Sequence, residues 1–282
     1  MENIKFADLH NHTTASDGLY TPKQLVYHAH TKGLAAIGVT DHDTTYGLNE
    51  AEIAGKEYNI EIIPGIEINT QENNMEVHVL GYFIDYHLDW FQEALSRIRT
   101  ARYDRARKIV DKLVNIYGMD LDFESVKEKA GGRDNVGRPH IARAMIDKGI
   151  VKDIPDAFEK YLGENCKAYV KRYKITVREG INLINKAGGV AVLAHPGLIG
   201  EDSIVERLVS YGFAGIEAYH SKHTTKQSRK YAKLSADKEL IITGGSDCHG
   251  EGVPMVGDVV IDYETVNKLR ESAKGLSRSF TY

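Results

Sequence analysis

Short apolar runs that alternate with helical patterns are the feature that most constrains the fold of this 282-residue chain. Helices are expected between the apolar runs, the first with Thr21 as its N-cap and Pro22 at its first position. The others are expected near residues 48–58, 176–187, 203–211, 225–237 and 263–273. Strands that alternate with helices of about ten or more residues indicate parallel βαβ units, and therefore a barrel or an open α/β sheet. The expected strands are residues 4–9, 35–39, 60–68, 77–83, 190–194, 215–218, 240–243 and 258–261.

The alternation stops between residues 88 and 170. A long helical pattern covers residues 88–117, and shorter helical pieces follow at 122–130, 139–148 and 154–162. The basic residues between Arg97 and Lys108 are expected on a solvated helix face. We therefore predict two parts, a metal-binding barrel domain formed by residues 1–87 and 171–282, and an inserted helical subdomain, residues 88–170, that recognises substrate.

Composition excludes several classes of protein. The hydrophobic fraction of 42% and the charged fraction of 27% are those of an ordinary globular chain. No apolar run reaches the ~18–20 residues that span a bilayer, and the N-terminus lacks a leader pattern, so we expect a cytoplasmic protein with no membrane partner. Two cysteines exclude a disulfide framework, and a net charge of −4 argues against binding of duplex DNA.

Histidines and carboxylates occur where the apolar strands end. The segments are Asp8-Leu9-His10-Asn11-His12 with Asp17, Thr40-Asp41-His42-Asp43, Gly65-Ile66-Glu67, Val77-His78-Val79, Ala194-His195-Pro196 and Ser246-Asp247-Cys248-His249. In parallel α/β architectures the carboxyl ends of the strands meet at one edge, where ligands bind. We therefore expect these side chains to converge on one rim.

This set of side chains predicts a metal site. A His-x-His pair on an extended segment places both imidazoles on the same side, because side chains alternate with period two. Histidine, aspartate and glutamate without cysteine suit Zn, Mn or Fe(II). Two ions ~3.5–4 Å apart can orient a hydroxide and stabilise both oxygens of a phosphoryl displacement. The candidate ligands are His10, His12, Asp17, His42, Glu67, His78, His195, Asp247 and His249.

Some of these segments have simpler interpretations. Asp41 and Asp43 could cap the following helix, which is the interpretation we favour for Asp43. His78 could be a hydrogen-bonded core histidine. Cys248 lies between two candidate ligands on an extended stretch, so its side chain points the other way and is expected to pack in the core.

The ordered motifs at residues 8–249 resemble those of the polymerase and histidinol phosphatase (PHP) superfamily of metal-dependent phosphoesterases. The resemblance implies an α/β fold, a distorted (β/α)7 barrel, with a trinuclear site. It implies that one ion is held by His10, His12, Glu67 and Asp247. It further implies that Glu67 bridges to a second ion held by His78 and His195, and that Asp17, His42 and His249 hold the third.

The predicted insertion narrows the resemblance. Its segment Asn135-Val136-Gly137-Arg138-Pro139-His140 looks like the branch that contains a 3′,5′-nucleotide bisphosphate phosphatase and a 5′-to-3′ exoribonuclease. Arg138 and His140 at a helix start would suit a second phosphate, although a solvent-facing helix start is the alternative.

Two further side chains are candidate substrate contacts. Arg172 belongs to a basic stretch interleaved with tyrosines that could hold phosphate, or could equally be a solvated surface. His220 and His223 follow a strand end, and of these two we favour His223 as the other candidate.

We therefore expect a metal-dependent phosphoesterase with two to three divalent ions, Mn, Fe or Zn. In this mechanism a metal-bound hydroxide attacks phosphorus and no separate protein base is assigned. The expected substrate is a 3′,5′-nucleotide bisphosphate such as pAp or a short 5′-phosphorylated oligonucleotide. The alternatives are a histidinol-phosphate or sugar-phosphate phosphatase of the same superfamily, and a non-catalytic nucleotide-binding protein.

Overall fold

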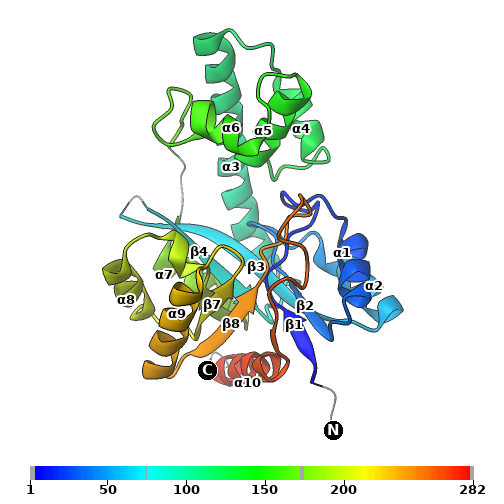
Figure 1. Cartoon of the computed structure of the whole chain (residues 1–282), viewed down its shortest axis with the longest axis vertical. Coiled ribbons are helices and arrows are strands. Elements are labelled where there is room, and N and C mark those ends of the chain that lie inside the picture. Colours follow the sequence, from blue (N-terminus) through cyan, green and yellow to red (C-terminus); the bar gives the residue numbers. More distant parts are fainter. Residues whose placement is uncertain (1–3, 74, 172–174, 280–282) are drawn as a thin grey trace. The chain divides into compact units, whose positions relative to one another are not determined.

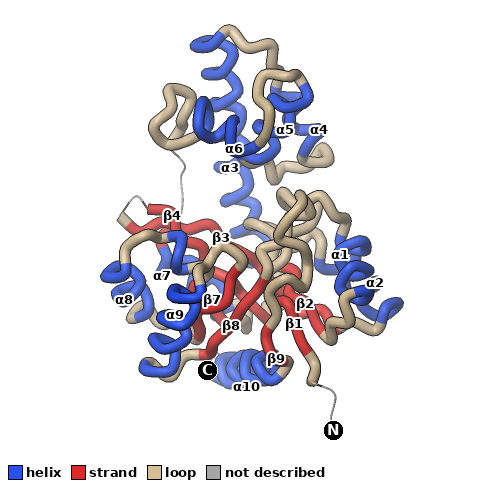
Figure 2. Tube along the Cα trace, viewed as in Figure 1, coloured by secondary structure: helices blue, strands red, loops and turns tan. Residues whose placement is uncertain are grey.

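The computed structural model describes residues 4–73, 75–171 and 175–279, and the chain divides into two compact units. The barrel unit comprises Met1–Gln92 and Lys174–Tyr282, and the helical unit comprises Glu93–Tyr173. Figure 2 shows that the strands belong to the barrel unit, whereas the helical unit is built from helices and loops. Within the described ranges, no helix combines the length and the apolar character that a bilayer crossing requires.

The barrel unit is built on one sheet with the strand order β8-β7-β6-β4-β3-β2-β1-β9, and β5 pairs with β3 beside this path. The strands are β1 (Phe6–Asp8), β2 (Ala36–Val39), β3 (Glu61–Glu72), β4 (Met75–Tyr82), β5 (Ile175–Thr176), β6 (Val190–Leu193), β7 (Gly215–His220), β8 (Ile241–Gly245) and β9 (Ile261–Asp262). Helices lie outside these strands (Figure 1). They are α1 (Pro22–Thr31), α2 (Leu48–Tyr58), α7 (Val177–Lys186), the 3-10 turn η2 (Pro196–Leu198), α8 (Asp202–Val209), α9 (Thr225–Asp237) and α10 (Glu264–Ser279).

Helix ends in the barrel unit follow local capping chemistry. Thr21 caps α1 as predicted, because its hydroxyl accepts a hydrogen bond from the Gln24 N–H while the Gln24 side chain accepts from the Thr21 N–H. Thr176 and Glu179 form the same reciprocal pair at the start of α7. The predicted helices at residues 48–58 and 225–237 coincide with α2 and α9.

The expectation of purely parallel strands is wrong at β4 and β9. β4 runs antiparallel to both β3 and β6, and β9 runs antiparallel to β1. β3 ends at Glu72 and β4 begins at Met75, so the connection is too short for the crossover that a parallel pair needs. The last strand was also expected too early, at residues 258–261, whereas β9 covers Ile261–Asp262.

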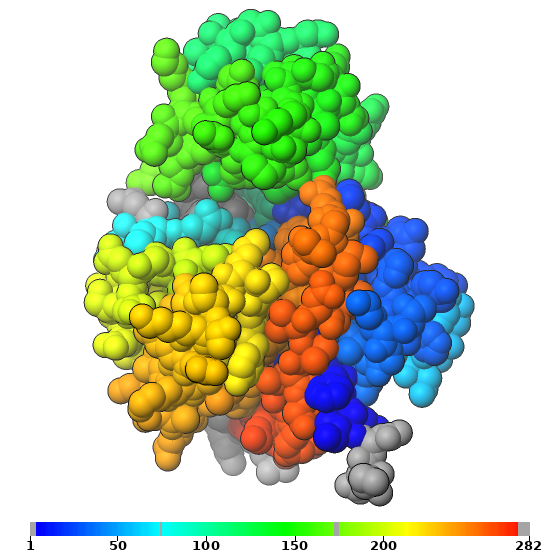
Figure 3. Space-filling model, in the orientation of Figure 1, coloured from blue at the N-terminus to red at the C-terminus, as the bar shows by residue number. Residues whose placement is uncertain are grey.

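The barrel closes where the end of β1 meets the segment that follows β8. The Leu9 N–H donates to the Gly244 carbonyl at 3.3 Å, and the Asp247 N–H donates to the His10 carbonyl at 2.8 Å. Seven strands, β1 to β4 and β6 to β8, therefore form a distorted barrel, as predicted. On the face drawn in Figure 3, the segment after β8, coloured orange, lies between the N-terminal residues in blue and the α9 region in yellow.

Each unit has its own hydrophobic core. In the barrel unit the core side chains come from the strands and from α1, α2 and α10, and they include Leu9, Ile63 and Leu269. Cys248 is buried in this core, as predicted. In the helical unit a separate cluster includes Leu113 and Ile141.

α3 (Asp89–Tyr117) begins in the barrel unit and continues through the helical unit. The other helices of the helical unit are α4 (Phe123–Lys129), α5 (Arg138–Asp147), α6 (Ile154–Ala157) and the π-helix η1 (Phe158–Leu162). The solvated face expected at the start of the basic run is wrong for two residues, because Arg99 and Arg102 are buried. The Arg99 Nε donates to Asp134 Oδ2 at 3.2 Å, which offsets the cost of burying that guanidinium.

Candidate metal centre

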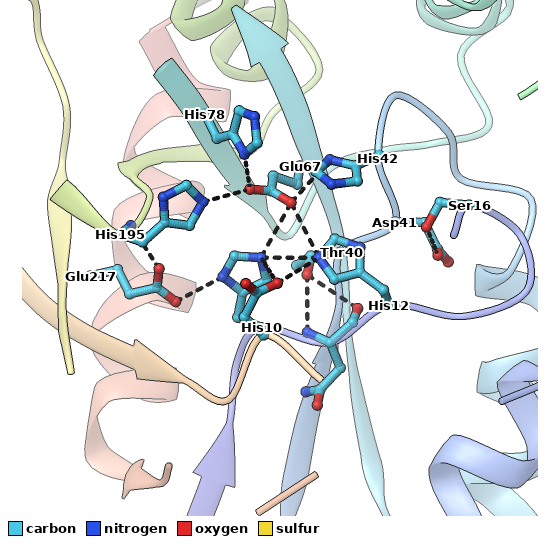
Figure 4. A network of polar contacts seen from close by, with 12 residues as sticks. His10, His12, Ser16, Thr40, Asp41, His42, Glu67, His78, His195 and Glu217 are labelled. Atoms are coloured by element: carbon cyan, nitrogen blue, oxygen red, sulfur yellow. Dashed lines mark hydrogen bonds and ion pairs between the residues drawn. The ribbon is translucent and has the colours of Figure 1, made fainter. Parts of the chain in front are cut away.

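Side chains that follow β1, β2 and β6, together with one from β4, converge on Glu67. Figure 4 shows His10, His12, His42, His78 and His195 turned toward its carboxylate. His10 and His12 follow β1, His42 follows β2, His78 lies on β4 and His195 follows β6. All of them are buried except His78, whose side chain is 17% exposed. Residues far apart in the sequence thus meet at one rim, as predicted.

Each oxygen of Glu67 faces a different group of imidazoles. Oε1 lies 2.6 Å from His78 Nδ1 and 3.0 Å from His195 Nε2. Oε2 lies 3.3 Å from His10 Nε2, 3.2 Å from His12 Nε2 and 3.0 Å from His42 Nδ1. The Glu67 carboxylate therefore stands between two groups of nitrogen atoms, which is the position that a bridging ligand needs.

The other candidate ligands complete this arrangement. Asp247 Oδ1 lies 3.2 Å from His12 Nε2 and 3.6 Å from His10 Nε2. On the other side, Asp17 lies 3.4 Å from His249 Nε2 and 4.0 Å from His42 Nε2. Ligand atoms of His12, Asp17, His42 and His249 all lie within 4.8 Å of one another, and so do those of His10, His12 and Glu67.

The charges in this cluster shift the pKa values of its members in opposite directions. Burial would raise the pKa of Glu67, but the imidazoles of His42, His78 and His10 outweigh it and hold that pKa well below its usual range. Burial likewise opposes the charged form of His12, but hydrogen bonds to Asp247 and Glu67 raise its pKa to about 10. His78 is raised in the same way to a pKa of about 9, whereas burial lowers the pKa of His42 to about 3.

The donor set fits divalent cations. The Nε2 atoms of His10 and His12 face each other at 3.2 Å, and two nitrogens of the same kind at that distance attract each other only through a shared proton or a shared cation. Mixed imidazole and carboxylate donors suit Zn, Mn and Fe(II). The geometry therefore supports the sequence-based interpretation of these side chains as ligands.

Three aspartates of the motifs support the loops that carry these side chains. Asp8 accepts hydrogen bonds from the backbone N–H groups of His10, Ser246 and Gly257, and burial raises its pKa to about 6. Asp41 accepts a hydrogen bond from the Thr13 N–H at 2.8 Å. It also accepts one from the Ser16 hydroxyl, which Figure 4 shows.

The favoured interpretation of Asp43 as a helix cap is wrong. Gly47 precedes α2 and no side chain caps that helix, while the Asp43 carboxylate accepts from the Asn69 N–H and from Asn69 Nδ2, each at 3.0 Å. The Asn69 side chain also lies 3.1 Å from His42 Nδ1. Asp43 thus orients Asn69 on β3, next to the His42 ring.

Of the predicted substrate contacts, His223 has both ring nitrogens engaged by the backbone. Its Nδ1 lies 3.0 Å from the Ala218 carbonyl and its Nε2 accepts from the Gly197 N–H at 3.0 Å. These bonds connect the η2 turn to β7. The contacts give His223 a structural role, and a contact with substrate stays a prediction.

The other predicted substrate contacts are Arg138 and His140, which lie in the helical unit, and Arg172. Arg138 begins α5, donates to the Leu162 carbonyl at 3.3 Å and stacks over the Phe158 ring at 5.2 Å. His140 is buried, and its Nδ1 accepts from the Gly137 N–H at 3.0 Å. Arg172 lies outside the described residues.

Glu217, a buried residue of β7, was missed by the sequence analysis, and the buried His220 of the same strand was considered only as an alternative substrate contact. Glu217 lies 2.9 Å from His10 Nδ1, and His220 Nε2 lies 3.3 Å from Asp247 Oδ2. The only sequence feature that could have indicated a role for Glu217 is its carboxylate inside the apolar run Gly215-Ile216-Glu217-Ala218. A charged residue is rarely fully buried without a partner, so its position in a buried strand indicates one.

Comparison with known proteins identifies the family. The PHP domain model matches residues 8–175. The chain belongs to the PHP domain family. A 5′-3′ exoribonuclease of Haemophilus influenzae is 33% identical over 270 residues, which cover 91% of this chain and 97% of that protein. A 3′,5′-nucleoside bisphosphate phosphatase of Chromobacterium violaceum is 34% identical over 265 residues, 91% of each chain.

Two solved structures share the fold of this chain. A putative metal-dependent phosphoesterase from Bifidobacterium adolescentis superposes with a TM-score of 0.86 at 30% identity and covers 93% of this chain and 94% of that chain. An amidohydrolase from Chromobacterium violaceum, solved with sulfate and without metal, superposes with a TM-score of 0.87 at 30% identity and covers 96% of each chain. The predicted family, the barrel fold and the class of metal-dependent phosphoester hydrolase are confirmed.

Proposed function

We propose that this PHP domain protein hydrolyses a phosphate ester of a small nucleotide, either a 3′,5′-bisphosphate or the end of a short 5′-phosphorylated oligonucleotide. The observation that carries the proposal is the convergence of five imidazoles on one buried carboxylate, Glu67. Nucleotide-directed relatives at 33–34% identity over 91% of this chain support the substrate class.

We assign the proposed ligands to three cation positions. His10, His12, Glu67 and Asp247 hold the first, Glu67, His78 and His195 the second, and Asp17, His42 and His249 the third. When bound, divalent cations at such positions lower the pKa of water and neutralise charge on phosphoryl oxygens. Mn, Fe and Zn all suit these donors, and Glu67, with one oxygen toward each imidazole group, is the proposed bridge between the first two positions.

The protein supplies pre-organisation around those positions. Asp8, Asp41 and Asp43 hold the loops through backbone and side-chain hydrogen bonds, so the ligands do not have to reorganise when a cation binds. Burial of the imidazoles keeps competing water away from the donors. In the 93–173 unit, Arg138 is the proposed partner of the phosphate that is not cleaved.

A substrate panel tests the proposal. The purified protein, stripped of metal and then reloaded with Mn²⁺, is assayed on adenosine 3′,5′-bisphosphate, histidinol phosphate and 5′-phosphorylated single-stranded RNA. We expect Mn²⁺-dependent release of phosphate or nucleotide from the first or the third substrate. Hydrolysis of histidinol phosphate alone would favour the sugar-phosphate type of phosphatase, and binding without hydrolysis would favour a nucleotide-binding protein.

Arg138→Ala tests the role of the helical insertion. Losing a charge-assisted bidentate contact costs about 1.5–3 kcal/mol, so we expect the KM for adenosine 3′,5′-bisphosphate to rise about 10- to 100-fold. The KM for an aryl phosphate, which has no second phosphate, should stay nearly unchanged. Arg97→Ala is the matched control, because Arg97 is an exposed arginine of the same unit that pairs with Glu93. Equal effects of Arg138→Ala on both substrates would remove Arg138 from substrate recognition.

A further inference from the structure

β7 contributes two buried polar side chains beneath the candidate metal centre but none of the nine predicted ligands. The Glu217 side chain is fully buried. Its Oε1 lies 2.9 Å from His10 Nδ1, and its Oε2 accepts a hydrogen bond from the His195 N–H at 2.8 Å. Figure 4 shows Glu217 placed between His10 and His195, on the far side of the His10 ring from Glu67.

The contact with His10 determines which nitrogen of the ring faces the cluster. Oε1 of Glu217 is an acceptor, so the Nδ1 of His10 must carry a proton to complete this bond. The other nitrogen, Nε2, lies 3.3 Å from Glu67 Oε2 and 3.6 Å from Asp247 Oδ1. A carboxylate on one side of an imidazole therefore keeps the proton on that side, and the opposite nitrogen is the one that would donate its lone pair to a cation.

The contact with His195 holds a backbone that is under strain. His195 has φ +23° and ψ +61°, a conformation that residues other than glycine seldom adopt. Such a conformation persists only where surrounding bonds determine it. The bond from the His195 N–H to Glu217 Oε2 is one of these, and it places the His195 Nε2 at 3.0 Å from Glu67 Oε1.

We propose that Glu217 is a positioning residue that orients two ligands at once, the His10 ring through its Nδ1–H and the His195 side chain through its backbone N–H. This inference rests on the proposed function, because it assigns His10 and His195 as ligands. We assign Glu217 no cation of its own, because its Oε1 contacts His10 Nδ1 and its Oε2 accepts from the His195 N–H.

Glu217→Gln tests this role with little change in volume. Glutamine has one acceptor oxygen for two N–H donors, so whichever bond it keeps, it loses the other. Loss of a group that hydrogen-bonds to a metal-ligating histidine lowers metal affinity about 10- to 100-fold. We therefore expect the Mn²⁺ dissociation constant of the metal-stripped protein, measured by competition with a fluorescent chelator, to rise by that factor.

Glu61→Gln is the matched control. Glu61 is the first residue of β3, six residues before Glu67, where it accepts from Tyr263 and Arg270. This variant should bind Mn²⁺ as the unchanged protein does. Glu217→Asp keeps two acceptor oxygens on a shorter side chain, so it should bind Mn²⁺ more tightly than Glu217→Gln and serves if the glutamine variant fails to fold.

A second readout separates positioning from general support of the fold. In the Zn²⁺-loaded protein with ¹⁵N-labelled histidine, the His10 Nδ1–H bonded to a carboxylate should give a strongly downfield proton signal. Glu217→Gln should lose this signal, and Glu61→Gln should keep it.

Three results would overturn the inference. These are unchanged Mn²⁺ affinity in Glu217→Gln, weaker affinity with an unchanged His10 signal, and an equal loss of affinity in Glu61→Gln. Failure of the unchanged protein to bind Mn²⁺ or Zn²⁺ is a different result, which would overturn the proposed function as well.

Discussion

At the scale of single residues, Glu67 is the side chain on which the candidate centre depends. It is buried, and each of its oxygens faces a different group of imidazoles. Its low pKa means that it stays ionised across the range in which proteins are assayed, so it can serve two cations at once.

Glu67→Gln should therefore remove bound metal and activity together. The amide has no negative charge and only one acceptor oxygen, so we expect fewer bound Mn²⁺ ions per chain and kcat/KM about 10²–10³-fold lower. Elemental analysis and the nucleotide assay measure the two effects. Glu72→Gln, on the same strand but bonded to Tyr211, is the control and should keep its metal. Full metal content in Glu67→Gln would remove Glu67 from the ligand set.

Metal affinity should rise with pH. The pKa values of His12 and His78, raised to about 10 and about 9, mean that both rings are protonated at neutral pH when no cation is bound. Each must release a proton to become a ligand. We expect Mn²⁺ binding by the metal-free protein to tighten from pH 6 to pH 9, with proton release visible as a dependence of the binding enthalpy on the buffer. An affinity that is flat across this range would contradict the shifts.

The free energy of unfolding of the metal-free protein should fall as the pH rises, whereas its metal affinity rises. For His12 the folded-state pKa of about 10 lies above the ordinary 6.5. The stabilisation of the folded state by protonated His12 is therefore fully present below pH 6.5, and it is lost as the pH rises toward 10.

Sequence reasoning at this scale found the ligand candidates because they follow strand ends as ordered motifs. It could not find Glu217, because one carboxylate in a short apolar run carries no spacing signal. Nor could it decide what Asp43 does, since the same residue suits a helix cap and a bond to a neighbouring strand. Such choices depend on which polar group the fold brings near, in this case Asn69.

At the scale of elements, glycine at the end of β8 allows the first and last strands of the barrel to approach. A Cβ added at Gly245 would lie 2.4 Å from both Cβ and N of His10. These neighbours cannot move aside as a flexible side-chain end would, because they are the Cβ and backbone atoms of His10. The position of His10 is therefore coupled to the absence of a side chain at residue 245.

Gly245→Ala should displace His10 and weaken metal binding. Overpacking of this kind costs about 1–3 kcal/mol, so we expect a lower free energy of unfolding in denaturant titrations and a higher Mn²⁺ dissociation constant. Gly275→Ala in α10 is the control, since nothing lies within 4 Å of its added Cβ. That change should be neutral or stabilising, by up to about 1 kcal/mol. Wild-type metal affinity in Gly245→Ala would show that His10 tolerates the shift.

Strand direction was the part of the element description that sequence reasoning missed. Caps such as Thr21 mark helix starts through local hydrogen bonds, so α1, α2 and α9 were predicted closely. The direction of β4 depends instead on the short connection after Glu72, which an alternation of apolar and helical runs does not describe. The antiparallel pairing sets Asn69 opposite His78, and so brings His78 to the side of β3 where Glu67 lies.

At the scale of the whole molecule, the candidate ligands connect strand ends around the barrel. A cation held by them binds the folded barrel and not the unfolded chain, so it stabilises the fold by mass action. At a free metal concentration about 1,000 times the dissociation constant, this effect amounts to about 4 kcal/mol.

Chelation should therefore lower the melting temperature. We expect removal of metal with EDTA to shift the thermal transition of the barrel unit by several degrees, and readdition of Mn²⁺ to restore it. The separate core of the 93–173 unit contains none of the ligands, so a second transition, if resolved by calorimetry, should not move. An EDTA-insensitive melting curve would mean that the centre is not loaded.

The closure of the barrel has a consequence for how the protein is made. The ribosome makes His10 and His12 well before Asp247 and His249, which lie in the segment that follows β8. The hydrogen bonds that join these segments, such as that from the Asp247 N–H to the His10 carbonyl, cannot form earlier. The candidate ligands can therefore enclose cations together only after the segment that follows β8 has been synthesised.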